Sequence, residues 1–392
     1  MSLNHVSMLA RTRRAASRAL LHRALAFLIV VAPLPVFAQA TLSVPAPVSV
    51  AEERAVEQAR DLVRAWVEKD NLAGASVAVG VDGDIVWAEG FGWADIEQRV
   101  PVTELTRFRI GSVSKPLSSV AVGLLYERGR IDLDAPVQTY VPSFPKKRWP
   151  ISTRQLMGHI AGIRHYRGDE FLSSKHYDGV LEGLAIFADD TLLFRPGTAY
   201  SYSSYGWNLV SAVVEKAAGE PFLQFMSREV IAPFGLRHTV PEYMVDIIPD
   251  RVHYYEHDDS GRLVNAPYVD NSYKWAGGGF LSTPSDLVRF GFGMLDAKVL
   301  QKKTVDLLWT PLHLASGKST GYGLGWVVDT ADGERVISHS GGSVGGTTMF
   351  MIFPDARMVV AITTNLTDAK VGPITKEVAK LFEGAAVAGV PR

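Results

Sequence analysis

The chain has 392 residues, of which 47% are hydrophobic and 21% are charged. This length and apolar content are sufficient for one large domain with a real core. Forty Lys and Arg residues stand against 41 Asp and Glu residues, so the chain lacks the basic excess typical of proteins that bind nucleic acid. The absence of cysteine excludes disulfides, thiolate metal sites and a lipid-bearing N-terminal cysteine.

Residues 1–38 have the pattern of a bacterial secretory signal peptide. Five arginines and no acidic residue are followed by the apolar run "ALAFLIVVAPLPVFA", which is short and contains two prolines. The small residues of "VFAQA" offer cleavage sites after Ala38 or Ala40. The sequence therefore predicts an exported, periplasmic protein without a stable membrane span. A mitochondrial presequence is the alternative, because the segment is also rich in arginine and free of acid.

Residues 39–50 contain prolines and are predicted to be a linker, and residues 51–392 are predicted to form the folded part. A helix is expected first, because apolar residues recur at helical spacing: Val56, Ala59, Leu62, Val63, Trp66 and Val67. "GASVAVGVDGDIVWAEG" then gives two β-rich runs around Asp82-Gly83. This pair accepts positive φ, so the stretch predicts a β-hairpin.

The C-terminal quarter of the chain also reads as strands. Four β-rich runs are separated by Gly, Asp and Pro turns: "GYGLGWVVD", "ERVISHS", "TTMFMIFP" and "MVVAITTN". A final helix is predicted from Pro373 to Phe382. The stretch between the two ends, roughly 117–300, is expected to be mainly helical and loop-rich. Within it, "STPSDLVRF" predicts a helix capped by Thr283.

These elements predict an α+β fold with two lobes. Both ends of the chain, about 51–115 and 301–392, would build one antiparallel sheet flanked by the N- and C-terminal helices. Residues 116–300 would form a second, mainly helical lobe. A cleft between two such lobes is the natural position for a binding site.

Three short motifs contain residues suited to nucleophilic catalysis. "FRIGSVSKPLSSV" places Ser112 and Lys115 one helical turn apart, on the same face. "YSYSSYGWNLV" brings Tyr202 and Ser204 in front of an apolar helix, and "ISHSGGSVGG" places His339 at a strand end. Alone, a Ser-x-x-Lys pair is most often a capping serine followed by a solvated lysine. The combination of the three motifs favours a serine nucleophile with a lysine beside it.

In this order, Ser-x-x-Lys, Tyr-x-Ser and His-x-Gly resemble the active-site motifs of the serine β-lactamase, DD-peptidase and esterase superfamily. The class C form is the most similar. "ISTRQLMGHIAGIRHY" and "WAGGGFLSTPSDLVRFG" extend the resemblance, and "GIRHY" is similar to the mitochondrial serine β-lactamase-like branch and its bacterial relatives. The resemblance implies that residues 51–392 form a β-lactamase/transpeptidase-like catalytic domain.

The resemblance also implies a role for each motif residue. Ser112 would be the nucleophile, and Lys115 would be its base if burial and Tyr202 lower its proton affinity. Tyr202 would pass the proton to the leaving group. The oxyanion would be held by the backbone N–H groups of Ser112 and Gly342. Gly341 would be glycine because a Cβ there would obstruct the substrate backbone.

The implied function is hydrolysis of an amide bond, in a peptide or a β-lactam, through an acyl-enzyme on Ser112. No metal or organic cofactor is expected, and the partner is a small-molecule or peptide substrate. An esterase with the same Ser-Lys-Tyr machinery is one alternative, and a slow-turnover penicillin-binding or scaffold protein is another. The sequence shows no interface from which an oligomeric state could be predicted.

Two positions differ from the usual family pattern. Ser204 stands where asparagine is most frequent, and its hydroxyl is shorter and has fewer donors. His339 stands where β-lactamases usually have a lysine. With an ordinary pKa of about 6.5, a histidine is mostly neutral at pH 7 and would bind a carboxylate more weakly as the pH rises through that range. The change favours peptides or esters over β-lactams.

Other polar motifs are interpreted as structural. "HYYEH" (253–257) matches an inverted zinc-peptidase pattern, but in an extended segment the two histidines would stand about 13 Å apart, too far to share one metal. His159 and His165 are expected to be hydrogen-bonded loop residues. The glycines at 277–279 and 345–346 predict tight turns at the cleft rather than a phosphate-binding loop.

Overall fold

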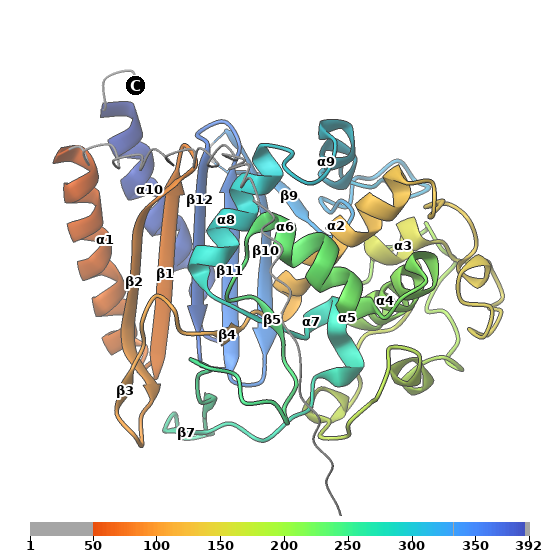
Figure 1. The fold of residues 1–392 in the computed structure, drawn as a ribbon, viewed down its shortest axis with the longest axis horizontal. Helices are drawn as coiled ribbons and strands as arrows, with labels where there is room; N and C mark the ends of the chain where they lie inside the picture. The colour runs from red at the N-terminus through yellow and green to blue at the C-terminus, as the bar shows by residue number, and fades with distance from the viewer. Residues whose placement is uncertain (1–49, 332, 389–392) are drawn as a thin grey trace, which may run out of the picture. The chain divides into compact units, whose positions relative to one another are not determined.

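An antiparallel sheet is the centre of the structure, a computed structural model that describes residues 50–331 and 333–388 (Figure 1). The predicted signal peptide, residues 1–38, and all but the last residue of the predicted linker lie outside the described residues. Among the described residues, seven strands form the sheet in the order β3-β2-β1-β12-β11-β10-β9. Their bounds are Val100–Pro101 (β3), Asp84–Asp95 (β2), Gly74–Val81 (β1), Met358–Thr364 (β12), Gly346–Phe353 (β11), Glu334–Ser343 (β10) and Val327–Ala331 (β9).

The N-terminal hairpin and the C-terminal strands meet in the middle of this sheet, as predicted. Strand β1 pairs antiparallel with β12 over its whole length from Ala75, which lies opposite Thr364, to Val81, which lies opposite Met358. The hairpin between β1 and β2 turns at Asp82 and Gly83, whose φ angles are 54° and 104°. Positive φ at both positions is the geometry of a tight two-residue turn that follows the strand twist.

One C-terminal strand is shorter than predicted. The run "GYGLGWVVD" was expected to be extended throughout, but β9 begins only at Val327. The residues before it bond to a different segment: Leu324 N donates to Leu308 O, and Leu312 N donates to Tyr322 O. These bonds hold the first half of the run in a loop beside the sheet.

Helices α1 (Val50–Lys69) and α10 (Val371–Ala388) pack together over one face of the sheet (Figure 1). In α1 the buried apolar residues are Ala55, Ala59, Val63 and Trp66, which follow the helical repeat that the sequence shows. Helix α10 starts two residues earlier than predicted and continues past Phe382. The flanking terminal helices are therefore confirmed.

Helix α8 (Pro284–Leu295) packs against the opposite face of the sheet, on β12 and β1. Because both faces are covered, every residue of β1 and β12 is buried, and neither strand shows the polar alternation of a half-exposed strand. Thr283 caps this helix, as predicted, by accepting a hydrogen bond from the backbone N–H of Asp286. The sequence grouped α8 with the helical lobe, and in the structure α8 contacts both the sheet and helix α6 (Ala232–Phe234).

The rest of the chain surrounds the buried helix α2 (Ser114–Glu127), and Leu117, Val120 and Ala121 in this helix are completely buried. It is mainly helical and loop-rich, as predicted, with five short strands among the described residues, of which only the pair around residues 255–265 was expected from the sequence. The helices are α3 (Thr153–Met157), α4 (Ser204–Ala218), α5 (Phe222–Phe225), α6 (Ala232–Phe234), α7 (Trp275–Gly278) and α9 (Lys302–Leu308). The short strands are β4 (Phe108–Arg109), β5 (Val240–Pro241), β6 (Tyr255–His257), β7 (Leu263–Asn265) and β8 (Phe280–Ser282).

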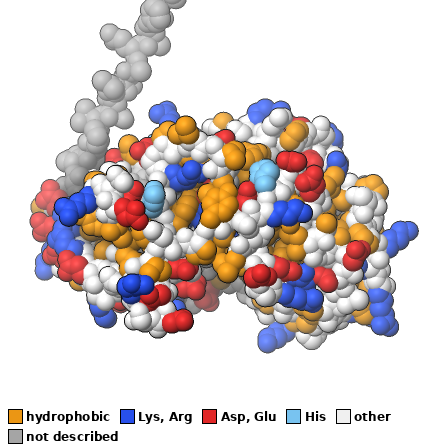
Figure 2. Space-filling model, turned by 90° about the horizontal axis from the view of Figure 1, so that it is seen from below, with side chains coloured by type: hydrophobic (Ala, Val, Ile, Leu, Met, Phe, Trp, Pro, Cys, Tyr) orange, Lys and Arg blue, Asp and Glu red, His pale blue; other side chains and the backbone are white. Residues whose placement is uncertain are grey.

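On the face of the molecule seen in Figure 2, basic and acidic side chains are interspersed between hydrophobic ones. Neither sign of charge forms a continuous area on this face. Among the described residues, no helix has both the length and the apolar character needed to cross a membrane.

Backbone conformation, and not side-chain space, requires glycine in the β1–β2 turn. An added Cβ at Gly83 or at Gly372 in α10 would meet no atom within 4 Å, but only Gly83 has a positive φ. We therefore expect Gly83→Ala to lower the free energy of unfolding by about 1–2 kcal/mol. Gly372→Ala is the control and should be neutral or stabilising by up to about 1 kcal/mol. Urea unfolding measures both, and equal effects would contradict this explanation of the hairpin.

Candidate active site

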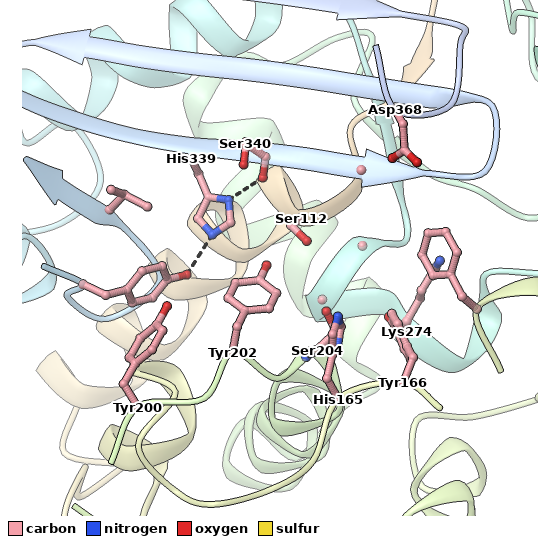
Figure 3. A pocket seen from close by; sticks show the side chains of 16 residues that line it. Ser112, His165, Tyr166, Tyr200, Tyr202, Ser204, Lys274, His339, Ser340 and Asp368 are labelled. Carbon is pink, nitrogen blue, oxygen red and sulfur yellow. Dashed lines mark hydrogen bonds between the residues drawn. The ribbon is translucent and has the colours of Figure 1, made fainter. Parts of the chain in front are cut away.

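A pocket of about 590 Å³ contains most of the residues that the sequence singled out (Figure 3). Ser112, Tyr202, Ser204, His339 and Gly342 all line it. They come from the turn before α2, from the first residue of α4 and the loop before it, and from strand β10. The first and the third of these motifs are more than two hundred residues apart in the chain. The structure therefore brings three distant motifs into one site.

Ser112 lies in a 3-10 turn, Gly111–Val113, directly before α2. Strand β10 packs against this turn so closely that a Cβ on Gly341 would stand 1.9 Å from the carbonyl oxygen of Ile110. The sequence attributed Gly341 to the space needed by the substrate. The structure shows a different reason that applies without any substrate, because the atom that excludes a side chain belongs to the turn that carries Ser112.

Lys115, in the first turn of α2, has no exposed surface and connects three segments of the chain. Its Nζ lies 2.9 Å from Ser112 Oγ, 3.2 Å from Ser204 Oγ and 2.8 Å from the carbonyl oxygen of Gly277. Burial lowers the pKa of Lys115 well below its ordinary value, and the positive charge of Lys274 lowers it further. The sequence expected Tyr202 to share this effect, but the second contributor is another lysine.

Tyr202 lies next to Ser112 and Lys115. Its hydroxyl points toward Ser112 (Figure 3), while the Nζ of Lys115 lies 4.8 Å from the centre of its ring. Burial raises the pKa of Tyr202, and a hydrogen bond with Ser112 opposes that shift. The phenol is therefore protonated at neutral pH and can donate a proton.

Two histidines fix the loop that carries Tyr202 and Ser204. His159 Nδ1 accepts a hydrogen bond from the backbone N–H of Ser203 at 3.1 Å, and His165 Nδ1 accepts one from that of Ser204 at 3.2 Å. Burial and the nearby Lys115 lower the pKa of His165 to about 4, so it accepts this bond as a neutral ring. These contacts agree with the structural role expected of both histidines.

His339 is buried and makes hydrogen bonds through both ring nitrogens. Nδ1 lies 2.6 Å from the carbonyl oxygen of Ser340, so it carries the proton, and Nε2 accepts from the hydroxyl of Tyr322 at 2.8 Å. Burial, assisted by the charge of Lys115, lowers the pKa of His339 to about 3. The sequence suggested that His339 titrates in the ordinary imidazole range. This expectation is wrong, because the buried environment keeps the ring neutral.

The sequence missed Lys274, which lines the pocket in the turn before α7, and the carbonyl oxygen of Gly277, which accepts a hydrogen bond from Lys115. The glycines at 277–279 were predicted to form a tight turn at the cleft. Gly277 and Gly278 do line it, although as part of the one-turn helix α7. The sequence offered one signal for Lys274, namely its position three residues before Gly277, a glycine predicted to lie at the cleft.

The "HYYEH" segment is extended at Tyr255–His257, as predicted. His253 lies 3.4 Å from Asp95, whereas Nε2 of His257 lies 3.1 Å from the carbonyl oxygen of Asn71. The two rings thus contact different parts of the chain. Within the described ranges, no group of three or more His, Asp or Glu side chains is placed to hold a metal ion.

A buried ion pair supports the turn that carries Ser112. Arg109, in β4, donates from Nε to both carboxylate oxygens of Glu242 at 2.8 Å and from Nη1 to the carbonyl oxygen of Val344 at 2.7 Å. Asn271 and Tyr254 donate to the same carboxylate. The pair therefore joins β4 to the β10–β11 turn and to the segment that precedes Lys274.

A serine beside a buried lysine and a tyrosine, under the edge of an antiparallel sheet, defines a serine hydrolase type of site. The family model named Beta-lactamase matches residues 59–381, and the chain belongs to this family. The human protein "Serine beta-lactamase-like protein LACTB, mitochondrial" is 32% identical over 77% of this chain and 72% of its own length.

"Penicillin-binding protein 4*" of Bacillus subtilis is 27% identical over 76% of this chain and 69% of its own. Among solved structures, the octameric penicillin-binding protein homologue from Pyrococcus abyssi superposes with a TM-score of 0.74. It is 25% identical and covers 84% of this chain and 77% of its own. The β-lactamase-like fold that the motifs implied is therefore confirmed.

The close approach of β10 to the Ser112 turn predicts different effects for two neighbouring glycines. Gly341→Ala should displace the turn, lower the free energy of unfolding by about 1–3 kcal/mol and reduce kcat about a hundredfold. Gly342→Ala is the control for stability and should leave the free energy of unfolding nearly unchanged, because a Cβ there would meet no atom within 4 Å. A Gly341→Ala enzyme with unchanged stability and a defect in KM alone would restore the substrate-space explanation.

The environment of His339 predicts that its ring stays neutral across the physiological range. In NMR spectra of ring-labelled protein, its imidazole signals, assigned by their loss in His339→Gln, should not shift between about pH 5 and 8. In urea-unfolded protein the same ring should titrate near its ordinary pKa of about 6.5. A folded-state titration near 6.5 would contradict the buried, neutral assignment.

Proposed function

We propose that this chain is a serine hydrolase that cleaves amide bonds, in peptides or β-lactams, through an acyl-enzyme on Ser112. The observation that carries the proposal is the contact between Ser112 Oγ and the buried Nζ of Lys115 at 2.9 Å. A serine needs a base that is neutral for part of the time, and the lowered pKa of Lys115 supplies one.

The contacts of Lys115 match those of a neutral amine poised as a base. A neutral amine has two N–H donors and one lone pair, and three groups surround Nζ. The carbonyl oxygen of Gly277 can only accept, and Ser204 can accept as well, which leaves the lone pair for the proton of Ser112. As Ser112 Oγ bonds to the substrate carbonyl carbon, its proton passes to Lys115.

The remaining steps use groups that face the pocket. The backbone N–H groups of Ser112 and Gly342 would hold the oxyanion, and Tyr202 would donate a proton to the leaving nitrogen as the amide bond breaks. Tyr202 then recovers a proton from Lys115. In deacylation, the same groups take a proton from water, which attacks the ester carbonyl and releases Ser112.

The neutral His339 supports substrates that need no fixed cation at that end of the pocket. Neutral amides meet this condition, and so do esters, which remain the alternative substrates of the same machinery. A slow-turnover penicillin-binding or scaffold role is the second alternative. From residues 1–38 we propose an exported protein, with mitochondrial import as the alternative.

Ser112→Ala should abolish covalent labelling by a fluorescent penicillin or a fluorophosphonate and abolish hydrolysis, while the Tm changes little because one hydroxyl at a pocket wall contributes little packing. Peptide mapping of the labelled wild type identifies the acylated serine. Ser316→Ala, at an exposed serine that does not line the pocket, is the control. Near wild-type turnover in Ser112→Ala would refute the assignment.

Lys115→Met removes the base while keeping the length and the apolar stem of the side chain. We expect acylation to slow about a hundredfold or more, because a positioned base contributes at least this much. Measuring kcat/KM for a matched anilide and phenyl ester separates amidase from esterase activity. Acylation without release in the wild type would instead support the slow-turnover alternative.

A further inference from the structure

Lys274 is a second buried lysine at the site, and the proposed reaction does not use it. It ends the turn Ser272–Lys274 before α7, and only 2% of its surface is exposed. Its side chain nevertheless lines the pocket, on the side of Tyr166 (Figure 3). Burying an ammonium group costs several kcal/mol unless a partner compensates for the lost water.

Glu242 is the acidic residue that could compensate for the charge of Lys274, but its carboxylate already accepts hydrogen bonds from other residues. Both carboxylate oxygens of Glu242 accept from Arg109, one also accepts from Tyr254 at 2.5 Å, and the other accepts from Asn271 at 2.6 Å. In the part of the chain that the structure describes, no hydrogen bond or salt bridge reaches Nζ of Lys274. This cation is therefore left without an anionic partner.

Aromatic rings surround the ammonium group of Lys274. Its Nζ lies 4.4 Å from the ring centre of Phe171, 5.4 Å from that of Tyr273 and 5.8 Å from that of Tyr166. Such rings attract a cation weakly and do not neutralise it. Burial lowers the pKa of Lys274, Arg109 lowers it further, and Glu242, which is ion-paired with Arg109, raises it. The positive charge at this end of the pocket is therefore that of Lys274 itself.

We propose that Lys274, with the rings of Tyr166 and Phe171, forms a subsite for a carboxylate on the acyl part of the substrate, so that the enzyme prefers acidic acyl side chains. The inference rests on the proposed function and adds the substrate class. Asp368 lines the same pocket but is exposed, and no salt bridge between it and Lys274 is present among the described residues. It leaves the positive charge of Lys274 available to a ligand.

His339 and Lys274 lie on opposite sides of Ser112 (Figure 3). Tyr202 lies between these sides, with its ring centre 6.3 Å from that of His339 and 5.5 Å from that of His165. As part of this proposal, we place the leaving group on the His339 side of Ser112. Lys274 lies toward the other side, with Tyr166, so the substrate group that reaches it stays attached to the enzyme in the acyl intermediate (Figure 3).

The test compares the p-nitroanilides of N-acetylglutamate and N-acetylglutamine, which differ in charge but hardly in shape and share a neutral leaving group. Both enantiomers are used, at about pH 6, which is below the lowered pKa of Lys274 of about 7. The wild type should favour glutamate by roughly tenfold or more in kcat/KM, as a hydrogen bond between charged groups permits.

Lys274→Met should remove that preference, and Lys274→Arg should keep part of it. The methionine variant also removes a positive neighbour of Lys115, which slows both substrates alike and leaves their ratio unaffected. Lys318→Met, at an exposed lysine, is the control and should keep the wild-type ratio. A wild-type ratio near one, or a preference that survives in Lys274→Met, would overturn the subsite.

A second measurement does not depend on turnover or on the folding of a variant. N-acetylglutamate should slow fluorophosphonate labelling of wild-type Ser112 at lower concentration than N-acetylglutamine does. Equal protection by the two compounds would overturn the subsite while leaving the serine hydrolase proposal intact. If wild-type protein showed neither labelling of Ser112 nor turnover of any of these substrates, the proposed function itself would be refuted.

Discussion

Lys115 is an amine with no exposed surface, held between the turn that carries Ser112, the loop that carries Ser204 and the carbonyl oxygen of Gly277. A buried amine at this junction can exist at low cost in two ways, either neutral or with all of its protons hydrogen-bonded. The arrangement provides three partners, so the folded state tolerates both forms. The proton transfer proposed for the reaction requires the same property. Burial of Lys115 thus links the stability of the junction to its chemistry.

The other parts of the fold keep this junction in place. Strand β10 approaches the Ser112 turn so closely that residue 341 has no room for a side chain. The Arg109–Glu242 pair holds the strand that precedes the turn, and His159 and His165 hold the loop before α4 through backbone N–H groups. Each of these contacts joins segments that are distant in the chain. The side chains proposed to be catalytic are therefore positioned by the sheet and its covering helices rather than by local sequence.

Electrostatics divide the pocket into two unlike ends. His339 is kept neutral by burial and by its two hydrogen bonds, so that end offers dipoles without a charge. Lys274 puts an ammonium group at the other end, among aromatic rings, and no acidic side chain of the described residues forms a salt bridge with it. Burial lowers the pKa of Lys115, and the positive charge of Lys274 lowers it further. In the proposed reaction, substrate selection and base strength would thus be coupled through one buried cation.

The amino-acid sequence alone determined the parts that depend on local patterns. The β-rich runs and the Asp82-Gly83 turn predicted the sheet. The apolar repeat of α1 predicted its covering helix, and the spacing of Ser112 and Lys115 predicted their contact. The sequence could not assign Lys274, because its burial depends on α7 and on rings brought from other segments. It also did not show the contact that excludes a side chain at Gly341, and it gave an ordinary pKa to His339. Close backbone approach and desolvation are properties of the packed structure, so only the tertiary fold decided them.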